Sequence, residues 1–186
     1  MSIEENDERF RSVVQKAKED QIKMNYSIAV AFGCPYEGGV SEEQVLRQVE
    51  KAVVLDVDRI TIADTIGYAI PSEVESLMPK VVEVAGDIPV AIHLHDTRGF
   101  GLANAYAAYK SGVKIFETAV SGIGGCPFAP GAAGNLATED LVYMFKRMGV
   151  ETGLDFDKVI EAADFAATLT TNKALGRIRH IERKFL

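Results

Sequence analysis

Four short apolar runs recur along this chain, and their spacing limits the fold more than any other feature. They are rich in valine, isoleucine and alanine, and they cover residues 26–32, 59–63, 89–94 and 114–120. Apolar runs of this length, with little polar alternation, are typical of strands buried on both faces of a parallel sheet. Successive runs start about 25 to 35 residues apart, which is the period of a strand–helix–strand unit. The sequence therefore predicts an α/β protein with four parallel strands.

Helical segments separate and follow these runs. Apolar residues recur at helical spacing over 41–53, 71–84, 102–110, 138–148 and 156–169. Ser41 is placed to cap the first of these segments, and Pro71 or Ser72 opens the second. A further helix is expected at the start of the sequence, where Ser2 and Glu5 have the spacing of a capping box. The predicted order is one helix followed by four β–α units.

A short repeat follows two of the predicted strands. The pattern Asp-Thr-x-Gly begins at Asp64 and again at Asp96, 32 positions later. Both copies lie at the carboxyl end of a strand, which is where (β/α)-barrel enzymes carry their chemistry. We therefore predict a parallel (β/α) barrel of the TIM type.

The chain is short for a complete barrel of this kind. Eight β–α units need about 250 residues, and this sequence has 186. We expect residues 1–170 to form the C-terminal half of a barrel, incomplete at its N-terminus, and residues 171–186 to form a basic tail. Four parallel strands alone leave two sheet edges open, so the other units lie outside this sequence or come from another chain. A homodimer and a complementing N-terminal half are both open alternatives.

Charge and hydropathy exclude several classes of partner. The net charge of −7 disfavours nucleic acid, because phosphate binding needs a basic face. No apolar run reaches the ~18 residues that would span a membrane. The opening residues are acidic and polar rather than a secretory signal, and two cysteines do not form a disulfide scaffold. We expect a cytoplasmic protein, or one of the mitochondrial matrix in a eukaryote, although no transit peptide is evident.

The basic residues of the tail form the one cluster of positive charge in the sequence. We interpret them as part of a solvated or packing segment rather than a binding patch, and we expect His180 in the same segment to lie at the surface. The cluster consists of Lys173, Arg177, Arg179, Arg183 and Lys184.

A His-x-His motif ends the third predicted strand. His93 and His95 are two positions apart, so their side chains point to the same face of the strand and toward the mouth of the barrel. Two neighbouring imidazoles are a natural pair of metal ligands. The alternative is a pair of histidines held by hydrogen bonds in a polar loop. We favour a metal site.

A glycine-rich loop follows the fourth predicted strand, over residues 121–134. Loops of this length at the end of a barrel strand are more often functional than not. Cys126 lies at its centre and is a candidate for proton transfer or nucleophilic attack, with burial as a small apolar side chain as the alternative. Asn135 ends the loop as either a helix cap or a metal ligand.

Four further polar residues could reach the mouth of the barrel. Asp64 is a candidate contact for the substrate. Glu37, in the segment of residues 33–39 after the first strand, either lines the mouth together with Cys34 or belongs to a structural turn. Glu139 and Asp140 fall in the first turn of a helix, where acidic residues often serve as caps.

Several motifs resemble those of the hydroxymethylglutaryl-CoA lyase family. They occur in the same order as in that family, and the similarity runs from about Ser2 to about Leu169. The loop around Cys126 resembles the signature of the family and is highly specific. The motifs are GCPYEG, DTIG, HLHDTRG, SGIGGCPFAPGAAGN and NLATEDLVYM.

The resemblance implies a chemistry and a set of site residues. His93, His95 and Asn135 would bind a divalent cation, Mg²⁺ or Mn²⁺, and His93 would also take part in catalysis. Cys126 would transfer a proton and Asp64 would contact the substrate. The reaction implied is a metal-assisted retro-Claisen cleavage of 3-hydroxy-3-methylglutaryl-CoA to acetyl-CoA and acetoacetate.

Two residues would support this implied site from close by. The resemblance assigns that role to Glu139, and Glu37 is a candidate for the same role.

One departure from the family limits what we expect of this chain alone. The family carries an arginine and a metal-binding aspartate at the end of its first barrel strand, and this sequence has no such strand. We therefore expect weak metal affinity and little or no lyase activity from the isolated chain. Two alternatives remain open: a lyase for a related branched 3-hydroxyacyl-CoA, and a non-catalytic half-barrel that assembles with itself or with an N-terminal chain.

Overall fold

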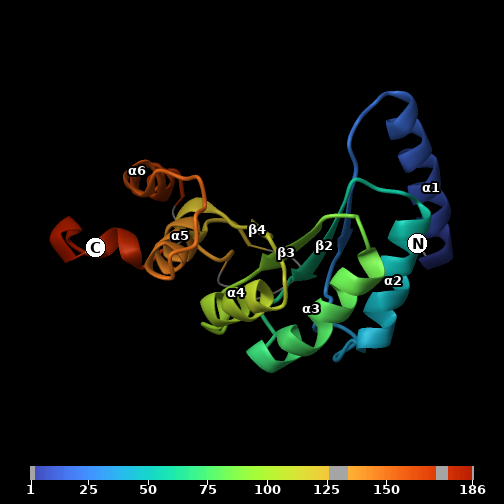
Figure 1. The fold of residues 1–186 in the computed structure, drawn as a ribbon, viewed down its shortest axis with the longest axis horizontal. Coiled ribbons are helices and arrows are strands. Elements are labelled where there is room, and N and C mark those ends of the chain that lie inside the picture. The colour runs from blue at the N-terminus through green and yellow to red at the C-terminus, as the bar shows by residue number, and fades with distance from the viewer. Residues whose placement is uncertain (1–2, 126–133, 171–175, 186) are drawn as a thin grey trace.

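The computed structural model describes residues 3–125, 134–170 and 176–185. Its elements alternate as the sequence predicts: an opening helix is followed by four β–α units and one further helix (Figure 1). The helices are α1 (Ile3–Glu19), α2 (Glu42–Val54), α3 (Pro71–Ala85), α4 (Gly101–Lys110), α5 (Thr138–Arg147) and α6 (Phe156–Ala167). The strands are β1 (Asn25–Ile28), β2 (Arg59–Asp64), β3 (Val90–Leu94) and β4 (Ile115–Glu117). Short 3₁₀ turns are η1 (Val120–Gly122), η2 (Ile178–His180) and η3 (Arg183–Phe185).

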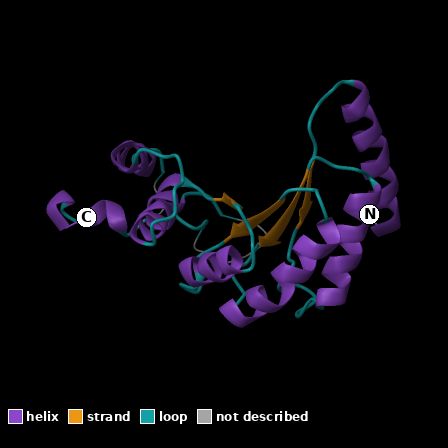
Figure 2. Cartoon of the chain, viewed as in Figure 1, coloured by secondary structure: helices purple, strands orange, loops and turns teal. Residues whose placement is uncertain are grey.

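The four strands form one parallel sheet in the order β1-β2-β3-β4. Helices α2, α3 and α4 lie together on one face of this sheet (Figure 2). This arrangement of consecutive β–α units is half of a (β/α) barrel, and it confirms the predicted fold class.

Side chains alternate between the two faces of the sheet, as the pleat of a strand requires. Ile60, Ile62 and Ile92 are almost fully buried within the apolar core of the protein. That core also contains apolar side chains from the helices: Val45, Val49, Val74, Leu77, Met78, Val81, Ala105 and Ala108. The intervening strand positions carry polar residues, among them Thr61 and His93, so the face away from the helices is the polar one.

Both edge strands are shorter than the apolar runs that predicted them. The first run leaves the sheet after β1, because Val30 adopts a left-handed backbone conformation with φ of 51°. The N–H of Val30 donates to Thr65 Oγ1 at 2.9 Å. The run after β4 ends in η1, where Ser121 has φ of 57°. Strand pairing requires extended backbone, so the positive φ of Val30 stops the first run from continuing as a strand. After β4, Ala119 is still extended, and the extended segment ends at Ser121.

Local signals set several helix ends. The Ser41 side chain accepts from the N–H of Gln44, whose own side chain accepts from the N–H of Ser41, which completes a capping box at the start of α2. Pro71 is the first residue of α3, where its missing N–H costs nothing. The opening helix is confirmed, but its expected cap, Ser2, lies outside the described residues.

The repeated Asp-Thr-x-Gly motif forms the same turn at the end of β2 and after β3. In each copy the aspartate carboxylate accepts a backbone N–H five residues later: Ala69 N–H for Asp64 at 3.1 Å, and Gly101 N–H for Asp96 at 2.8 Å. The glycine of each copy has positive φ, 60° at Gly67 and 77° at Gly99, which side chains rarely tolerate. The repeat therefore builds two equivalent loops at the carboxyl ends of neighbouring strands.

Part of the basic tail packs on the body of the protein. Arg179 Nη1 lies 3.0 Å from Asp164 Oδ1 on α6, and His180 is exposed, as expected. Lys173 lies outside the described residues. None of the helices in the described ranges is long and apolar enough to cross a membrane.

Candidate metal centre and active site

Two segments that are forty residues apart in the sequence pair beside the end of β3. Leu136 N–H donates to Leu94 O at 2.9 Å, and Asp96 N–H donates to Gly134 O at 3.1 Å. This antiparallel bridge sets Asn135 directly opposite His95. The pairing brings the end of the glycine-rich loop against the His-x-His motif.

The two histidines of that motif lie close together. Their ring centroids are 5.2 Å apart, as expected for side chains on the same face of a strand. His95 is buried, and burial, with a smaller contribution from His93, lowers its pKa to about 4. The ring of His95 is therefore neutral near pH 7, which is the form that binds a metal ion.

Each residue of this bridge carries a buried polar atom without a hydrogen-bond partner. Nδ1 of His95 and Oδ1 of Asn135 are both buried and unpaired. The amide of Asn135 is fixed because its Nδ2 donates to Ile123 O at 2.9 Å, which leaves Oδ1 open. Buried polar atoms normally have partners, so an open nitrogen and an open oxygen on two residues that are paired in a bridge fit a bound cation.

The described ranges hold no group of three His, Cys, Asp or Glu side chains that could hold a metal ion. The candidate set here is two imidazoles and one amide oxygen: His93, His95 and Asn135. Imidazole nitrogens suit transition metals, and the amide oxygen also suits Mg²⁺ or Mn²⁺. These residues therefore fit a divalent cation, whose remaining ligands would come from a substrate or from another part of the protein.

The glycine-rich loop enters this site from η1. Gly124 has φ of 96°, and a side chain at that position would meet Asn135 Nδ2, so only glycine lets the loop pass this close. Cys126 itself lies outside the described residues. Its role in catalysis stays a prediction.

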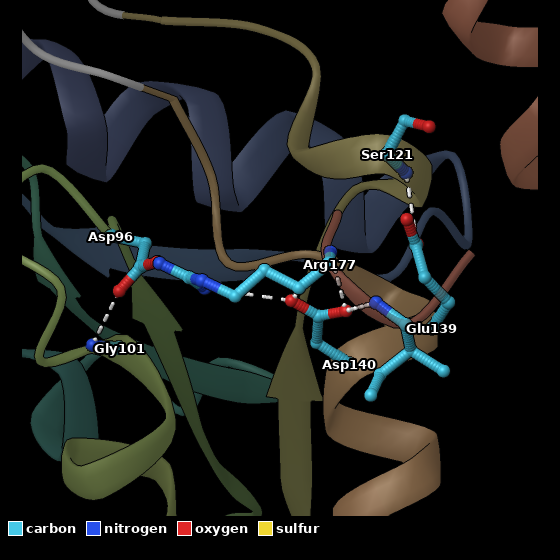
Figure 3. A network of polar contacts seen from close by, with 7 residues as sticks. Asp96, Gly101, Ser121, Glu139, Asp140 and Arg177 are labelled. Carbon is cyan, nitrogen blue, oxygen red and sulfur yellow. Dashed lines mark hydrogen bonds and ion pairs between the residues drawn. The ribbon is translucent and has the colours of Figure 1, made fainter. Parts of the chain in front are cut away.

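Glu139 is fully buried beside Ser121. Its Oε2 accepts the N–H of Ser121 at 2.9 Å, and its Oε1 has no partner (Figure 3). Burial raises the pKa of this carboxyl above its ordinary value. Gly176 packs so closely that a Cβ there would overlap Glu139 Oε1. Glu139 thus holds the left-handed turn at Ser121 from which the loop departs.

A C-terminal arginine joins two buried carboxylates near the histidines, which the sequence did not lead us to expect. Arg177 Nη2 lies 2.8 Å from Asp96 Oδ2, and its Nη1 lies 3.5 Å from Asp140 Oδ2 (Figure 3). Asp140 also accepts the backbone N–H groups of Arg177 and Ile178, both at 2.9 Å. Asp140 therefore anchors the C-terminal segment, and that segment in turn holds the residue next to His95.

Asp64 lies at the end of β2 and is almost completely buried. Its Oδ1 accepts the N–H of Tyr68 at 2.7 Å and its Oδ2 accepts that of Ala69 at 3.1 Å. Burial raises its pKa to about 6 against these hydrogen bonds and the charge of Arg98, which lower it. Both oxygens are engaged with the loop, so contact with a substrate would come in addition to this structural role.

Glu37 lies in a turn after β1, apart from the histidine pair. Cys34 and Gly38 exchange backbone hydrogen bonds of 2.8 and 3.0 Å, so the segment is a closed turn. Glu37 is exposed and lines a hollow whose other walls come from the end of β1 and from α2. Neither histidine lines this hollow.

A second residue that the sequence did not single out is Glu117, at the end of β4. It is the cross-strand neighbour of His93, and its Oε2 lies 3.5 Å from His93 Nδ1. A lone acid within an apolar run was the available signal, since charged residues are rarely buried in strands without a partner.

Fold and site together define half of a parallel (β/α) barrel whose polar groups gather at the carboxyl ends of the strands. The chain belongs to the HMGL-like family, because the model of that family matches residues 1–166. This agrees with the resemblance drawn from its motifs.

Relatives of known activity come from both bacteria and mammals. The chain is 45% identical to (R)-citramalyl-CoA lyase of Chloroflexus aurantiacus over 161 residues, which cover 86% of this chain and 51% of that protein. It is 39% identical to the mitochondrial hydroxymethylglutaryl-CoA lyase of Mus musculus over 177 residues, which cover 95% of this chain and 54% of that protein. The chain thus spans about half the length of these curated relatives.

A solved structure matches the whole chain. It is an HMG-CoA lyase from Acinetobacter baumannii in complex with coenzyme A and 3-methylmalate, with a TM-score of 0.92 and 35% identity. The match covers 100% of this chain and 61% of that one. The half-barrel is therefore the arrangement found within a larger lyase.

Proposed function

We propose that this chain carries the metal-binding part of an acyl-CoA carbon–carbon lyase. The observation that carries the proposal is the pair of open, buried atoms at the end of β3, Nδ1 of His95 and Oδ1 of Asn135, with His93 beside them. The family membership and the coenzyme A bound to the Acinetobacter relative support an acyl-CoA as substrate.

The reaction is a retro-Claisen cleavage. A base removes the proton of the tertiary hydroxyl, a carbonyl forms there, and the bond to the α-carbon of the thioester breaks. Its electron pair leaves as a thioester enolate, which takes up one proton to give acetyl-CoA. A bound divalent cation would make the hydroxyl more acidic and offset the charge that develops on its oxygen.

The residues of this chain would bind, orient and transfer protons around that reaction. His93, His95 and Asn135 hold the cation and Cys126 supplies or removes a proton. Glu139 supports the start of the loop that carries Cys126. Asp64 keeps the neighbouring loop in place and contacts the substrate.

The leading substrate is 3-hydroxy-3-methylglutaryl-CoA, and citramalyl-CoA is the second candidate. Citramalyl-CoA is a candidate because the chain is 45% identical to the citramalyl-CoA lyase of Chloroflexus aurantiacus. The two thioesters differ by one methylene between the hydroxyl-bearing carbon and the far carboxylate. Both release acetyl-CoA, but the other product is acetoacetate in the first case and pyruvate in the second.

The open edges of the sheet point to an assembly partner. β1 pairs with β2 and β4 pairs with β3, so in the described part of the chain each edge strand is hydrogen-bonded on one side. We propose that further β–α units close the barrel, either from the same polypeptide or from a second one. The molar mass in solution separates a self-complementing dimer from a monomer or a mixed complex.

The test is to supply the full-length protein, meaning this chain together with the units that complete its barrel, with Mg²⁺ and each thioester in turn. Chromatography and mass spectrometry detect acetyl-CoA, acetoacetate and pyruvate. We expect metal-dependent acetyl-CoA release that EDTA abolishes and that His95→Gln reduces by at least 100-fold. His180→Gln is the matched control, because His180 is exposed on the C-terminal segment. Absence of acetyl-CoA with both thioesters, or full activity in His95→Gln, would refute the proposal.

A further inference from the structure

A polar cluster lies next to His93, on the face of the sheet that the helices leave open. Its centre is the carboxylate of Glu117 on β4. Thr61 Oγ1 lies 3.0 Å from Glu117 Oε1 and 3.0 Å from Asn25 Oδ1, so Glu117 shares the one hydroxyl proton of Thr61 with Asn25. Arg59 Nη2 lies 3.5 Å from the same oxygen of Glu117. These two β2 residues fix one carboxylate oxygen and leave the other for a different partner.

That other oxygen faces His93. Glu117 Oε2 lies 3.5 Å from His93 Nδ1, and the two residues are paired across β3 and β4. The separation is longer than a closed N–H···O bond. Contacts between catalytic side chains are often long without ligands and tighten in the complex. The geometry thus offers His93 Nδ1 an anionic acceptor that its neighbours hold in place.

We propose that Glu117 is a positioning residue that keeps the proton of His93 on Nδ1 and so leaves Nε2 free to bind the cation. The hydrogen bond made by one ring nitrogen decides which tautomer is present. Carboxylates that accept from a metal-binding histidine also orient the ring and make its other nitrogen more basic. This inference rests on the proposed function, because it assumes that His93 binds a cation. The contact between Glu117 and His93 does not depend on that function.

The two histidines then differ in the nitrogen that they offer. His93 presents Nε2 because Nδ1 faces Glu117, whereas the open, buried atom of His95 is Nδ1. Thr61 is fully buried, so the anchor of Glu117 is shielded from water. The cluster therefore holds the ring of His93 through its Nδ1.

Glu117→Gln tests the proposal with little change in shape. The Thr61 hydroxyl and the Arg59 guanidinium are donors, so they would hold the amide oxygen and turn the amide NH₂ toward His93. Nδ1 would then have to accept, and the ring proton would move to Nε2. The matched control is Glu43→Gln, a carboxylate exposed on α2 that pairs with Arg47.

The first readout is the tautomer of His93, measured by ¹⁵N NMR on the full-length protein with labelled histidine. The measurement is made without added metal at about pH 8.5, two units above the ordinary pKa of imidazole. This chain contributes three histidines, and the variants His180→Gln and His95→Gln assign their signals. We expect the proton on Nδ1 in the wild type and in Glu43→Gln, and on Nε2 in Glu117→Gln.

The second readout is Mn²⁺ affinity, measured by the electron paramagnetic resonance signal of the free ion. We expect Glu117→Gln to bind about 10- to 100-fold more weakly than the wild type, and Glu43→Gln to bind equally well. Circular dichroism and the melting temperature verify that each variant is folded.

The two readouts separate this inference from the proposed function. A wild-type protein with the proton on Nε2 of His93 overturns the inference, and so does a Glu117→Gln variant with unchanged tautomer and affinity. A wild-type protein that does not bind Mn²⁺ but keeps the proton on Nδ1 supports the role of Glu117 and refutes the metal-dependent function.

Discussion

The buried carboxyl of Asp64 gives a prediction about stability that depends on pH. The change is Asp64→Asn, which keeps the shape of the side chain and one acceptor oxygen but cannot ionise. In the wild type, burial raises the pKa of this carboxyl to about 6, even though two backbone N–H groups and Arg98 favour the charged form. The folded protein therefore holds the proton of Asp64 more tightly than the unfolded chain does.

The sign and size of the effect follow from proton linkage. A raised carboxyl pKa contributes stability below the unfolded value of about 3.9, and this contribution is lost as the pH rises through the folded value. With the two pKa values two units apart, the wild type should lose about 2 kcal/mol relative to Asp64→Asn between pH 4.5 and pH 7.5. The comparison with the variant cancels the titration of the other groups.

Urea unfolding of both proteins at pH 4.5, 6.0 and 7.5 measures this difference. The free energy of unfolding of the wild type minus that of Asp64→Asn should fall steadily over the series. A constant difference would mean that the carboxyl has an ordinary pKa. A difference that grows with pH would mean that the hydrogen bonds to Tyr68 and Ala69 outweigh burial, and either result would refute the reasoning.

Two further substitutions test the contacts that hold the C-terminal segment and a helix end. Arg177→Met removes the cation between Asp96 and Asp140 and should lower the free energy of unfolding by about 1 to 2 kcal/mol, between the values for exposed and buried pairs, because the arginine is partly exposed. In urea unfolding, the free energy lost in Arg177→Met should be smaller in 0.5 M than in 0.05 M NaCl, because salt screens ion pairs. A loss under 0.3 kcal/mol at low salt would contradict a stabilising role for the ion pairs of Arg177. Ser41→Ala breaks the capping box with Gln44 and should cost about 1 kcal/mol in the same assay. No change would mean that water caps α2 equally well.

The sequence predicted the repeating units because their signals are local. Apolar runs, helical spacing and caps such as Ser41 depend on neighbouring residues, and each β–α unit forms its own share of the core. The ends were less accurate: the run after β1 was expected to stay extended, but the loop of Thr65 draws Val30 into a left-handed turn. That contact joins two strands and leaves no trace in either segment alone.

The candidate site was predictable only in part. The alternation of a strand places His93 beside His95, and the pattern alone carries that information. The position of Asn135 opposite His95 depends on a bridge between distant segments. The resemblance of the motifs to those of the family predicted that Asn135 and His95 belong to one site. The spacing of residues in the sequence could not predict it.

Two residues that contact the site, Arg177 and Glu117, were not predicted from the sequence, and the reason is the same for both. Arg177 looked like one basic residue among several in a tail, and its partners lie 37 and 81 positions away. Glu117 stood alone within an apolar run, and its significance depends on His93 in the neighbouring strand. Charged residues acquire a role from their partners, and partners of this kind are set by the tertiary fold.

The most direct test of the central claim is a crystal structure of the full-length protein with Mn²⁺, with anomalous scattering used to locate the metal. We expect one anomalous peak bonded to His93, His95 and the side-chain oxygen of Asn135. His93 should bind through Nε2 and His95 through Nδ1. A peak elsewhere, or no peak at a Mn²⁺ concentration that supports acetyl-CoA release, would contradict the account.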